Sequence, residues 1–411
     1  MSARQQKRPV VGMILERDFP PDDRPEKEAL SLIKAGYEVH LLCFTWQNRP
    51  RYENYKGIHI TRFPISKKVY KKLSAAYLVQ PFYRALWKRQ MERFVSENRI
   101  EVIHMHDLPM TDIAHELAAR HGCRVVCDQH EYWSNWIVNT GHYNRGLGKV
   151  VKAFSDWKHY ERENLSKADL VITVTEPLRA LYLEEVGLAA EKVIVVPNTP
   201  SRDIFRRENV NPEIVEKYKN YFVLFYAGAM DVLRGLDMII DALPEIEKKV
   251  PHVRLVLAGR FSKSFDPLAL ARERGVEHLV EFVGWLNVEQ LPSYIAAARV
   301  GVFTPPATRD EINNTIATKI YQYLAMGKPI LTSEAKMMHD FVSKNDLGCT
   351  VNHGDVRGCA AAIIRLAENY EQRSAEIARN AAALINREPI FWDQTISDML
   401  KHYASWESRE G

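Results

Sequence analysis

The last third of this chain contains a strand, a polar loop and a helix in direct succession, and this order strongly constrains the fold. The apolar run 299–303 predicts a strand, and a polar loop over 307–314 leads into a helix predicted over 315–326. Gly327 and Pro329 stop the helix, because glycine accepts a left-handed cap and proline cannot continue the hydrogen-bond ladder. The loop and the helix N-terminus therefore lie at the carboxyl end of a strand. Open α/β sheets bind ligands there, and helix N-termini attract anions.

Short strands alternate with helices in both halves of the chain, which predicts two parallel sheets. A length of 411 residues also favours two domains over one core. The stretch 199–220 has no clear periodicity and is the best candidate for the linker. We therefore expect an α/β chain with an N-terminal domain over 1–200 and a second domain over 201–388. The stretch 351–355 is expected to be an edge strand or a loop.

Charge and composition exclude some classes of protein and point to a soluble one. The net charge of +4 is too small to argue for a nucleic-acid partner. No apolar run reaches the roughly 18–20 residues of a membrane span, and no cleavable signal follows the basic N-terminus. Five scattered cysteines are expected to be reduced thiols in a cytoplasmic protein, although a disulfide or zinc pair of Cys123 and Cys127 is the alternative.

A basic, aromatic-rich segment over 62–91 contains no acidic residue. Such a segment fits an anionic membrane surface or a lipid-phosphate acceptor. The alternative is a solvated basic helix face whose aromatic rings pack inward. The residues expected on the acceptor or membrane side are Lys67, Lys68, Lys71, Lys72 and Trp87.

Imidazoles and carboxylates follow two predicted strands of the first domain. One strand ends in His104, His106 and Asp107, and the other leads into Asp128, His130 and Glu131. A zinc or manganese site is one interpretation, and it would suit a metal-dependent hydrolase. The other is a set of polar strand ends bonded to the following helices.

The segment 319–330, KIYQYLAMGKPI, resembles the nucleotide-sugar site of the family 4 retaining glycosyltransferases, which have the GT-B fold. Two glutamates of the family motif fall on Asn314 and Gln322, which are amides here. The resemblance implies two Rossmann-like domains whose sheets face each other across a cleft. It also implies a C-terminal helix, within 389–411, that crosses back to the N-terminal domain.

The resemblance also assigns site residues. By this resemblance His130 would approach the donor sugar or its phosphate, and Glu131 would contact the acceptor. Asn314, or Asp310 and Glu311 after a shift of the loop, would face the sugar. The second domain would hold the donor, with Ala229 in place of the first of two basic residues of the motif. The expected donor-binding residues are Gly228, Arg234, Gly235, Arg260, Gly284, Lys319 and Gln322.

These resemblances predict an enzyme that transfers a sugar with retention from a nucleotide-sugar to a glycan or lipid-linked acceptor, in polysaccharide or glycolipid biosynthesis. No metal and no cofactor beyond the nucleotide-sugar co-substrate is expected. The protein would be cytoplasmic, with peripheral membrane contact and no nucleic-acid partner. Three alternatives stay open: a catalytically impaired binding protein of the same fold, a sugar-nucleotide epimerase, and the metal-dependent hydrolase.

Overall fold

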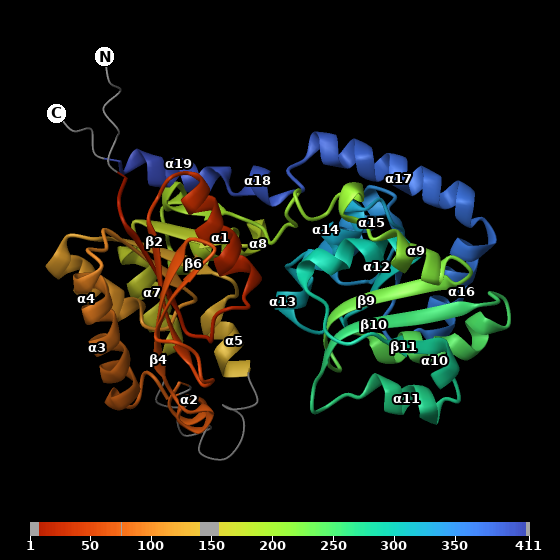
Figure 1. Cartoon of the computed structure of the whole chain (residues 1–411), viewed down its shortest axis with the longest axis horizontal. Coiled ribbons are helices and arrows are strands. Elements are labelled where there is room, and N and C mark those ends of the chain that lie inside the picture. Colours follow the sequence, from red (N-terminus) through yellow and green to blue (C-terminus); the bar gives the residue numbers. More distant parts are fainter. Residues whose placement is uncertain (1–7, 75, 140–155, 408–411) are drawn as a thin grey trace. The chain divides into compact units, whose positions relative to one another are not determined.

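The computed structural model describes residues 8–74, 76–139 and 156–407. The chain divides into two compact units, each with its own parallel sheet (Figure 1). Unit 1 consists of Met1–Pro197 and Ile396–Gly411, and unit 2 is Asn198–Thr395. None of the described helices is both long and apolar enough to cross a bilayer.

The sheet of unit 1 has the strand order β3-β4-β2-β1-β5-β6-β7-β8 within the described residues. Every neighbouring pair is parallel except β3 and β4. The central strand β1 is the apolar run VGMIL and is buried on both faces, as expected for a parallel strand covered by helices. The strands are β1 (Val11–Leu15), β2 (Val39–Thr45), β3 (Tyr52–Tyr55), β4 (Ile58–Pro64), β5 (Val102–His106), β6 (Arg124–Gln129), β7 (Leu170–Thr173) and β8 (Val193–Val195).

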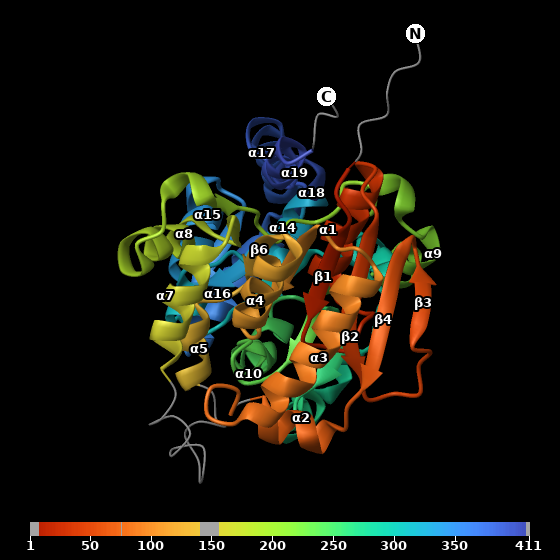
Figure 2. The same cartoon turned by 90° about the vertical axis from the view of Figure 1, so that its left-hand side faces the viewer.

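Helices cover the sheet of unit 1, and Figure 2 shows α3 and α4 in front of the strands. Amphipathic patterning places them: α1 buries Ala29 and Leu32, for example, and its outer face is charged. The helices are α1 (Asp23–Lys34), α2 (Lys67–Leu73), α3 (Pro81–Glu97), α4 (Thr111–His121), α5 (Trp133–Asn139), α7 (Trp157–Lys167), α8 (Glu176–Leu181) and α19 (Ser397–Ser405).

Unit 2 has the strand order β11-β10-β9-β12-β13-β14, all parallel. Its strands are β9 (Phe222–Met230), β10 (Val253–Phe261), β11 (Val280–Phe282), β12 (Val300–Phe303), β13 (Ile330–Ser333) and β14 (Gly348–Val351). Its helices are α9 (Pro212–Tyr218), α10 (Leu236–Glu247), α11 (Pro267–Glu273), α12 (Leu291–Ala297), α13 (Asp310–Asn313), α14 (Thr318–Ala325), α15 (Lys336–Lys344), α16 (Val356–Glu368), α17 (Tyr370–Arg387) and α18 (Trp392–Thr395).

The local structure differs from the sequence expectation in unit 2. The strand near residue 351 lies earlier than expected, as β14, and it pairs with β13. The long polar loop contains the short helix α13, and the next helix begins at Thr318 because Ala317 is still extended.

The C-terminal helix α19 belongs to unit 1, as the resemblance implied. Its Tyr403 is fully buried, and the Tyr403 hydroxyl lies 2.7 Å from Nδ1 of His104 on β5. The ring of Tyr403 also packs edge-on against Tyr37. The end of the chain is therefore part of the core that the first strands build.

Candidate active site

The loop after β9 is fixed against the end of β12 by a glycine. Gly235 has φ +69°, and a Cβ there would lie 1.7 Å from the carbonyl oxygen of Thr304. The Thr304 hydroxyl donates to the carbonyl oxygen of Gly235 at 2.8 Å. Glycine is therefore required here for both backbone conformation and close approach. The contact holds the N-terminus of α10 at the carboxyl end of the sheet.

The backbone at Gly228 is bare and faces an ammonium group. Gly228 has φ +145°, and a Cβ there would lie 3.3 Å from the hydroxyl of Tyr226 and 3.6 Å from Nζ of Lys319. A side chain at this position would fill the space beside the Lys319 ammonium. Glycine instead lets a ligand approach the backbone and the cation together.

Lys319, at the start of α14, is a cation held against aromatic rings. Its Nζ lies 4.1 Å from the ring centre of Phe303 and 5.1 Å from that of Tyr226. Burial and, to a smaller extent, the charge of Arg234 lower the pKa of Lys319 to about 7, against the opposing charge of Asp231. Within the described ranges Lys319 forms no salt bridge. An anion bound beside it would therefore restore its full charge.

Arg234 supplies the second cation of this region. Its side chain is 38% exposed, and Nε lies 3.3 Å from Oδ2 of Asp231. Asp231 is also held by its own loop, because its Oδ1 accepts from the backbone N–H of Leu233 at 2.8 Å. Arg234 and Lys319 thus give the carboxyl end of β9 two cations near one bare backbone segment. Such an arrangement suits a phosphate or diphosphate.

Arg260 lies on β10 and Gly284 in the turn after β11, and an exposed indole follows Gly284. The guanidinium of Arg260 lies 4.4 Å from the ring centre of Trp285, whose side chain is 51% exposed. The backbone N–H of Gly259 donates to the carbonyl oxygen of Gly284 at 2.8 Å, which fixes this turn against β10. Trp285 was not among the expected site residues, although an exposed tryptophan directly after a strand-end glycine is a signal that could have identified it.

The two amides that replace the family glutamates lie on α14 and at the end of α13. Gln322 is partly buried and follows Lys319 by three residues, so both lie on one face of α14. Asn314 is exposed. In the described part of the chain neither side-chain amide is engaged in a hydrogen bond, so both can bond to a ligand.

The strand ends of unit 1 form a charge cluster around Asp128. The guanidinium of Arg24 on α1 donates from Nε to Oδ2 of Asp128 at 2.9 Å and from Nη2 to Oδ1 at 2.6 Å. Burial alone would raise the pKa of Asp128, but the charges of Arg24 and His130 hold it well below the ordinary value. Asp128 is therefore a buried carboxylate whose charge the protein itself neutralises.

His130 lies beside this carboxylate. Its Nε2 lies 2.7 Å from Oδ2 of Asp128, and its Nδ1 lies 3.3 Å from Oδ1 of Asp107. Burial disfavours the imidazolium, but the two carboxylates outweigh it and raise the pKa of His130 to about 9. His130 is thus a cation at neutral pH. Glu131 follows it in the chain and is partly buried.

Comparisons with known proteins agree with this geometry. The family described as "Glycosyl transferase 4-like domain" matches residues 26–199, and "Glycosyl transferases group 1" matches residues 221–369. An uncharacterized glycosyltransferase of Methanocaldococcus jannaschii is 22% identical, with 91% of each chain covered. The chain is a family 4 glycosyltransferase of the GT-B fold.

Solved glycosyltransferase structures share this fold. A sucrose-phosphate synthase from Thermosynechococcus elongatus superposes with a TM-score of 0.74 at 17% identity, covering 97% of this chain and 99% of that one. The Anabaena protein HepE in complex with UDP superposes with a TM-score of 0.68 at 16% identity, covering 96% and 100%. The expected fold, α/β with two Rossmann-like units, is confirmed.

The expected surface role of Trp87 in this glycosyltransferase needs correction. The Trp87 indole is 0% exposed and packs edge-on against Phe63 with 4.9 Å between ring centres. Lys67 and Lys68 are exposed, and Nζ of Lys67 lies 5.0 Å from the ring centre of Trp46. The side chains of Lys71 and Lys72 lie outside the described residues. This aromatic ring therefore packs inward, whereas the two described lysines face solvent.

The hydrolase alternative finds no support in the geometry. His104 is 0% exposed, His106 is 1% exposed and Asp128 is 0% exposed, so these side chains offer no surface to a substrate.

The five cysteines are free thiols, as expected.

Proposed function

We propose that this glycosyltransferase uses a nucleoside-diphosphate sugar and transfers the sugar with retention, without a metal ion in the reaction. The observation that carries the proposal is the pair of cations, Arg234 and Lys319, beside the bare backbone of Gly228. Neutralising the leaving diphosphate is the main electrostatic task of such a transfer. The Anabaena neighbour was solved with UDP and with UDP-glucose, which supports a uracil nucleotide as the first candidate.

Different residues of unit 2 bind different parts of the nucleotide-sugar. Arg234 and Lys319 bind the diphosphate, and each charge-assisted hydrogen bond contributes about 1.5–3 kcal/mol. Gln322 bonds to the ribose hydroxyls, since an amide both donates and accepts. The exposed face of Trp285 stacks on the base, with Arg260 behind it.

The reaction then needs no protein base. The acceptor hydroxyl attacks the anomeric carbon on the same face from which the diphosphate leaves. The bond between the anomeric carbon and the diphosphate oxygen breaks, and an oxygen of the departing phosphate accepts the proton of the hydroxyl. In this proposal Asn314 contacts the sugar, His130 contributes its positive charge, and Glu131 contacts the acceptor.

The proposal extends to a glycan or lipid-linked acceptor at an anionic membrane face, in polysaccharide or glycolipid biosynthesis. Lys67 and Lys68 on α2 are exposed, and the side chain of Phe82 on α3 is 75% exposed. Exposed cations and an exposed aromatic ring suit a peripheral contact with anionic lipid. Sedimentation with anionic vesicles tests it: Phe82→Ser should reduce co-sedimentation, and unchanged binding would count against this face.

A proton NMR transfer assay tests the reaction itself. The full-length chain is incubated with UDP-sugars and a panel of glycan and lipid-linked acceptors in the presence of EDTA. The expected product carries the anomeric configuration of the donor, and Arg234→Ala slows its formation. An inverted product contradicts retention. Nucleotide binding without transfer to any acceptor favours the catalytically impaired protein, in which Asn314 and Gln322 have replaced the glutamates.

A further inference from the structure

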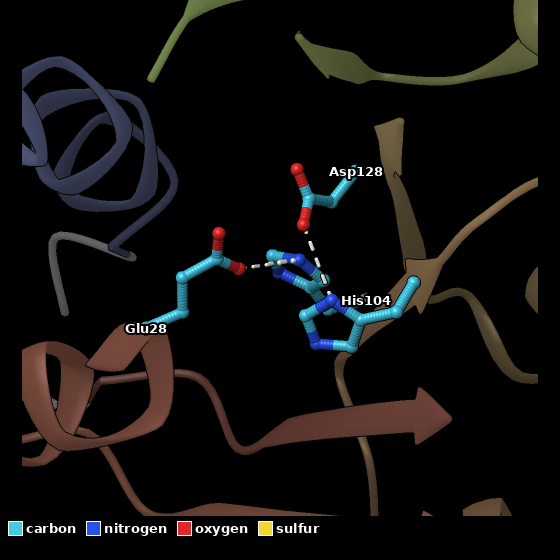
Figure 3. A group of neighbouring side chains, drawn as sticks. Glu28, His104 and Asp128 are labelled. Atoms are coloured by element: carbon cyan, nitrogen blue, oxygen red, sulfur yellow. Dashed lines mark hydrogen bonds and ion pairs between the residues drawn. The ribbon is translucent and has the colours of Figure 1, made fainter. Parts of the chain in front are cut away.

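A second group of chemically active side chains lies inside unit 1, and it includes Asp128, the carboxylate that also contacts His130. Glu28, His104, His106 and Asp128 each place one possible ligand atom within 4.8 Å of the others (Figure 3). All four are 0–1% exposed. The family assignment and the proposed transfer chemistry use none of the first three.

The topology of the sheet brings these residues together. His104 and His106 are two residues apart on β5, so their side chains project from the same face of the strand. Asp128 lies opposite His106 on the neighbouring strand β6. Glu28 comes from α1, which covers this face, and Figure 3 shows Glu28, His104 and Asp128 directed toward a common point.

The ring nitrogens are arranged as in a metal site. Nδ1 of His104 lies 2.7 Å from the Tyr403 hydroxyl, and Nδ1 of His106 lies 3.2 Å from Oδ2 of Asp128. In both rings the other nitrogen, Nε2, is buried without a hydrogen-bond partner. A histidine whose one nitrogen is held by a hydroxyl or carboxylate presents the other nitrogen to a metal.

Glu28 supplies the negative charge of the group. Both of its carboxylate oxygens are buried without a hydrogen-bond partner. Oε2 lies 3.1 Å from Nε2 of His104, and Oε1 lies 3.1 Å from Nε of Arg24. These contacts bring opposite charges together without hydrogen-bond geometry. Four polar atoms on three side chains are therefore buried close together without a hydrogen-bond partner. Such atoms are rare in native structures, and a bound ion is one explanation for them.

We propose that Glu28, His104 and His106 bind a structural zinc ion in unit 1, with Asp128 as the outer partner of His106. Two imidazoles and one carboxylate are a donor set that zinc accepts. Asp128 takes the outer position because Arg24 already occupies both of its oxygens. Zinc held at about 2.0–2.2 Å needs ligand atoms about 3.4 Å apart, so the group closes with shifts on the order of 1 Å.

The ion would stabilise the fold and take no part in sugar transfer. Its ligands are closed to solvent, and they join α1 to β5. Through the Tyr403 hydroxyl the site also reaches α19, the returning C-terminal helix. Zinc here would tie the start, the middle and the end of unit 1 together. The inference does not depend on the proposed donor binding, because Glu28, His104 and His106 lie in unit 1, whereas the donor-binding cations Arg234 and Lys319 lie in unit 2.

Elemental analysis and cobalt spectroscopy of the full-length protein test the proposal. Protein from zinc-supplemented cultures, dialysed against metal-free buffer, should retain one zinc ion per chain. After zinc removal, Co²⁺ should give the visible absorption of a low-coordinate nitrogen and oxygen site. His106→Gln should lose the metal, whereas the control His115→Gln, whose ring lies on α4 and contacts the Asn164 carbonyl oxygen, should keep it.

The contradicting results are equally definite. A chain that retains no zinc and gives no cobalt spectrum overturns the site, and the cluster then holds only protons or water. Retention of equal zinc by His106→Gln overturns it as well. If His106→Gln does not fold, the wild-type zinc content and cobalt spectrum decide. Arg234→Ala should keep its zinc while binding the nucleotide more weakly, so failure of one proposal is distinguishable from failure of the other.

Discussion

The two sheets of this glycosyltransferase end in opposite electrostatic arrangements. At the carboxyl edge of unit 1, Arg24 pairs with Asp128, and His130 lies between Asp128 and Asp107. At the carboxyl edge of unit 2, Lys319 is packed against aromatic rings with a lowered pKa, and its neighbour Arg234 is half-exposed. In unit 1 the charges of Asp128 and His130 are thus paired within the protein, whereas unit 2 holds cations that an anion would stabilise.

This difference separates charge that stabilises a fold from charge that binds a ligand. A buried ion pair that loses one partner leaves an uncompensated charge in the core. An exposed or weakly paired cation costs little to remove, but its removal takes an interaction away from the ligand.

Asp128→Asn should destabilise unit 1 strongly. The substitution removes the carboxylate that Arg24 and His130 share, and losing one partner of a buried pair costs about 3–5 kcal/mol. The matched control is Asp231→Asn in unit 2, where the partner Arg234 is 38% exposed and the expected cost is below about 1 kcal/mol. Differential scanning calorimetry measures both, and equal shifts in Tm would remove the distinction between the two edges.

Arg234→Ala should weaken nucleoside-diphosphate binding without affecting the fold. Loss of one charge-assisted hydrogen bond of about 1.5–3 kcal/mol corresponds to a roughly 10- to 150-fold rise in Kd. Arg274→Ala is the control, because Arg274 is also 38% exposed and paired with an aspartate, Asp241, at 2.7 Å. Isothermal titration of UDP into each variant gives the comparison, and similar losses in both would show that Arg234 is only one surface charge among others.

Lys319 should make nucleotide binding depend on pH. Its pKa is about 7 in the ligand-free protein, and a bound phosphate raises that pKa by favouring the ammonium. Binding is therefore tight below about pH 7 and weakens by up to roughly tenfold per pH unit above it, until the raised pKa is reached. Affinities measured from pH 7 to 9 should show this fall, and Lys319→Arg, which stays charged, should flatten it. A flat wild-type profile would contradict the assignment.

Two exposed tryptophans give the smallest and most specific comparison. Trp285 in unit 2 and Trp46 in unit 1 are 51% and 37% exposed, and each lies beside a cation. Trp285→Ala should weaken UDP binding about fivefold, since stacking of a base on an aromatic ring contributes roughly 1 kcal/mol. Trp46→Ala should leave binding unchanged. Equal effects would remove Trp285 from the base-binding surface.

Much of the fold could be predicted because alternating strands and helices encode a parallel sheet locally. The short edge strand β3 escaped prediction because its sequence, YENY, is polar on an exposed edge. The strand β14 was misplaced because its pairing with β13, rather than its own composition, defines it. Both depend on tertiary partners that periodicity does not report.

Residues of the candidate site that belong to a sequence motif could be predicted. Properties that depend on how a side chain is buried could not. The glycines and Lys319 follow from the motif. The lowered pKa of Lys319 could not be predicted, because it depends on burial against Tyr226 and Phe303. Glu28 was missed because an acidic residue in an amphipathic helix usually faces solvent, and only its packing against β5 shows that it is buried. Trp87 was misjudged for the converse reason, since helix α3 turns that ring inward.

We expect unit 2 to bind a nucleoside diphosphate with its own cations and without a metal. The most direct measurement is an isothermal titration of UDP into the full-length protein, performed with EDTA and with added Mg²⁺. We expect saturable binding with the same Kd in EDTA and in Mg²⁺. Binding should be accompanied by proton uptake near pH 7.5, because Lys319 regains its charge. Binding that requires Mg²⁺, or the absence of binding with any nucleoside diphosphate, would contradict it.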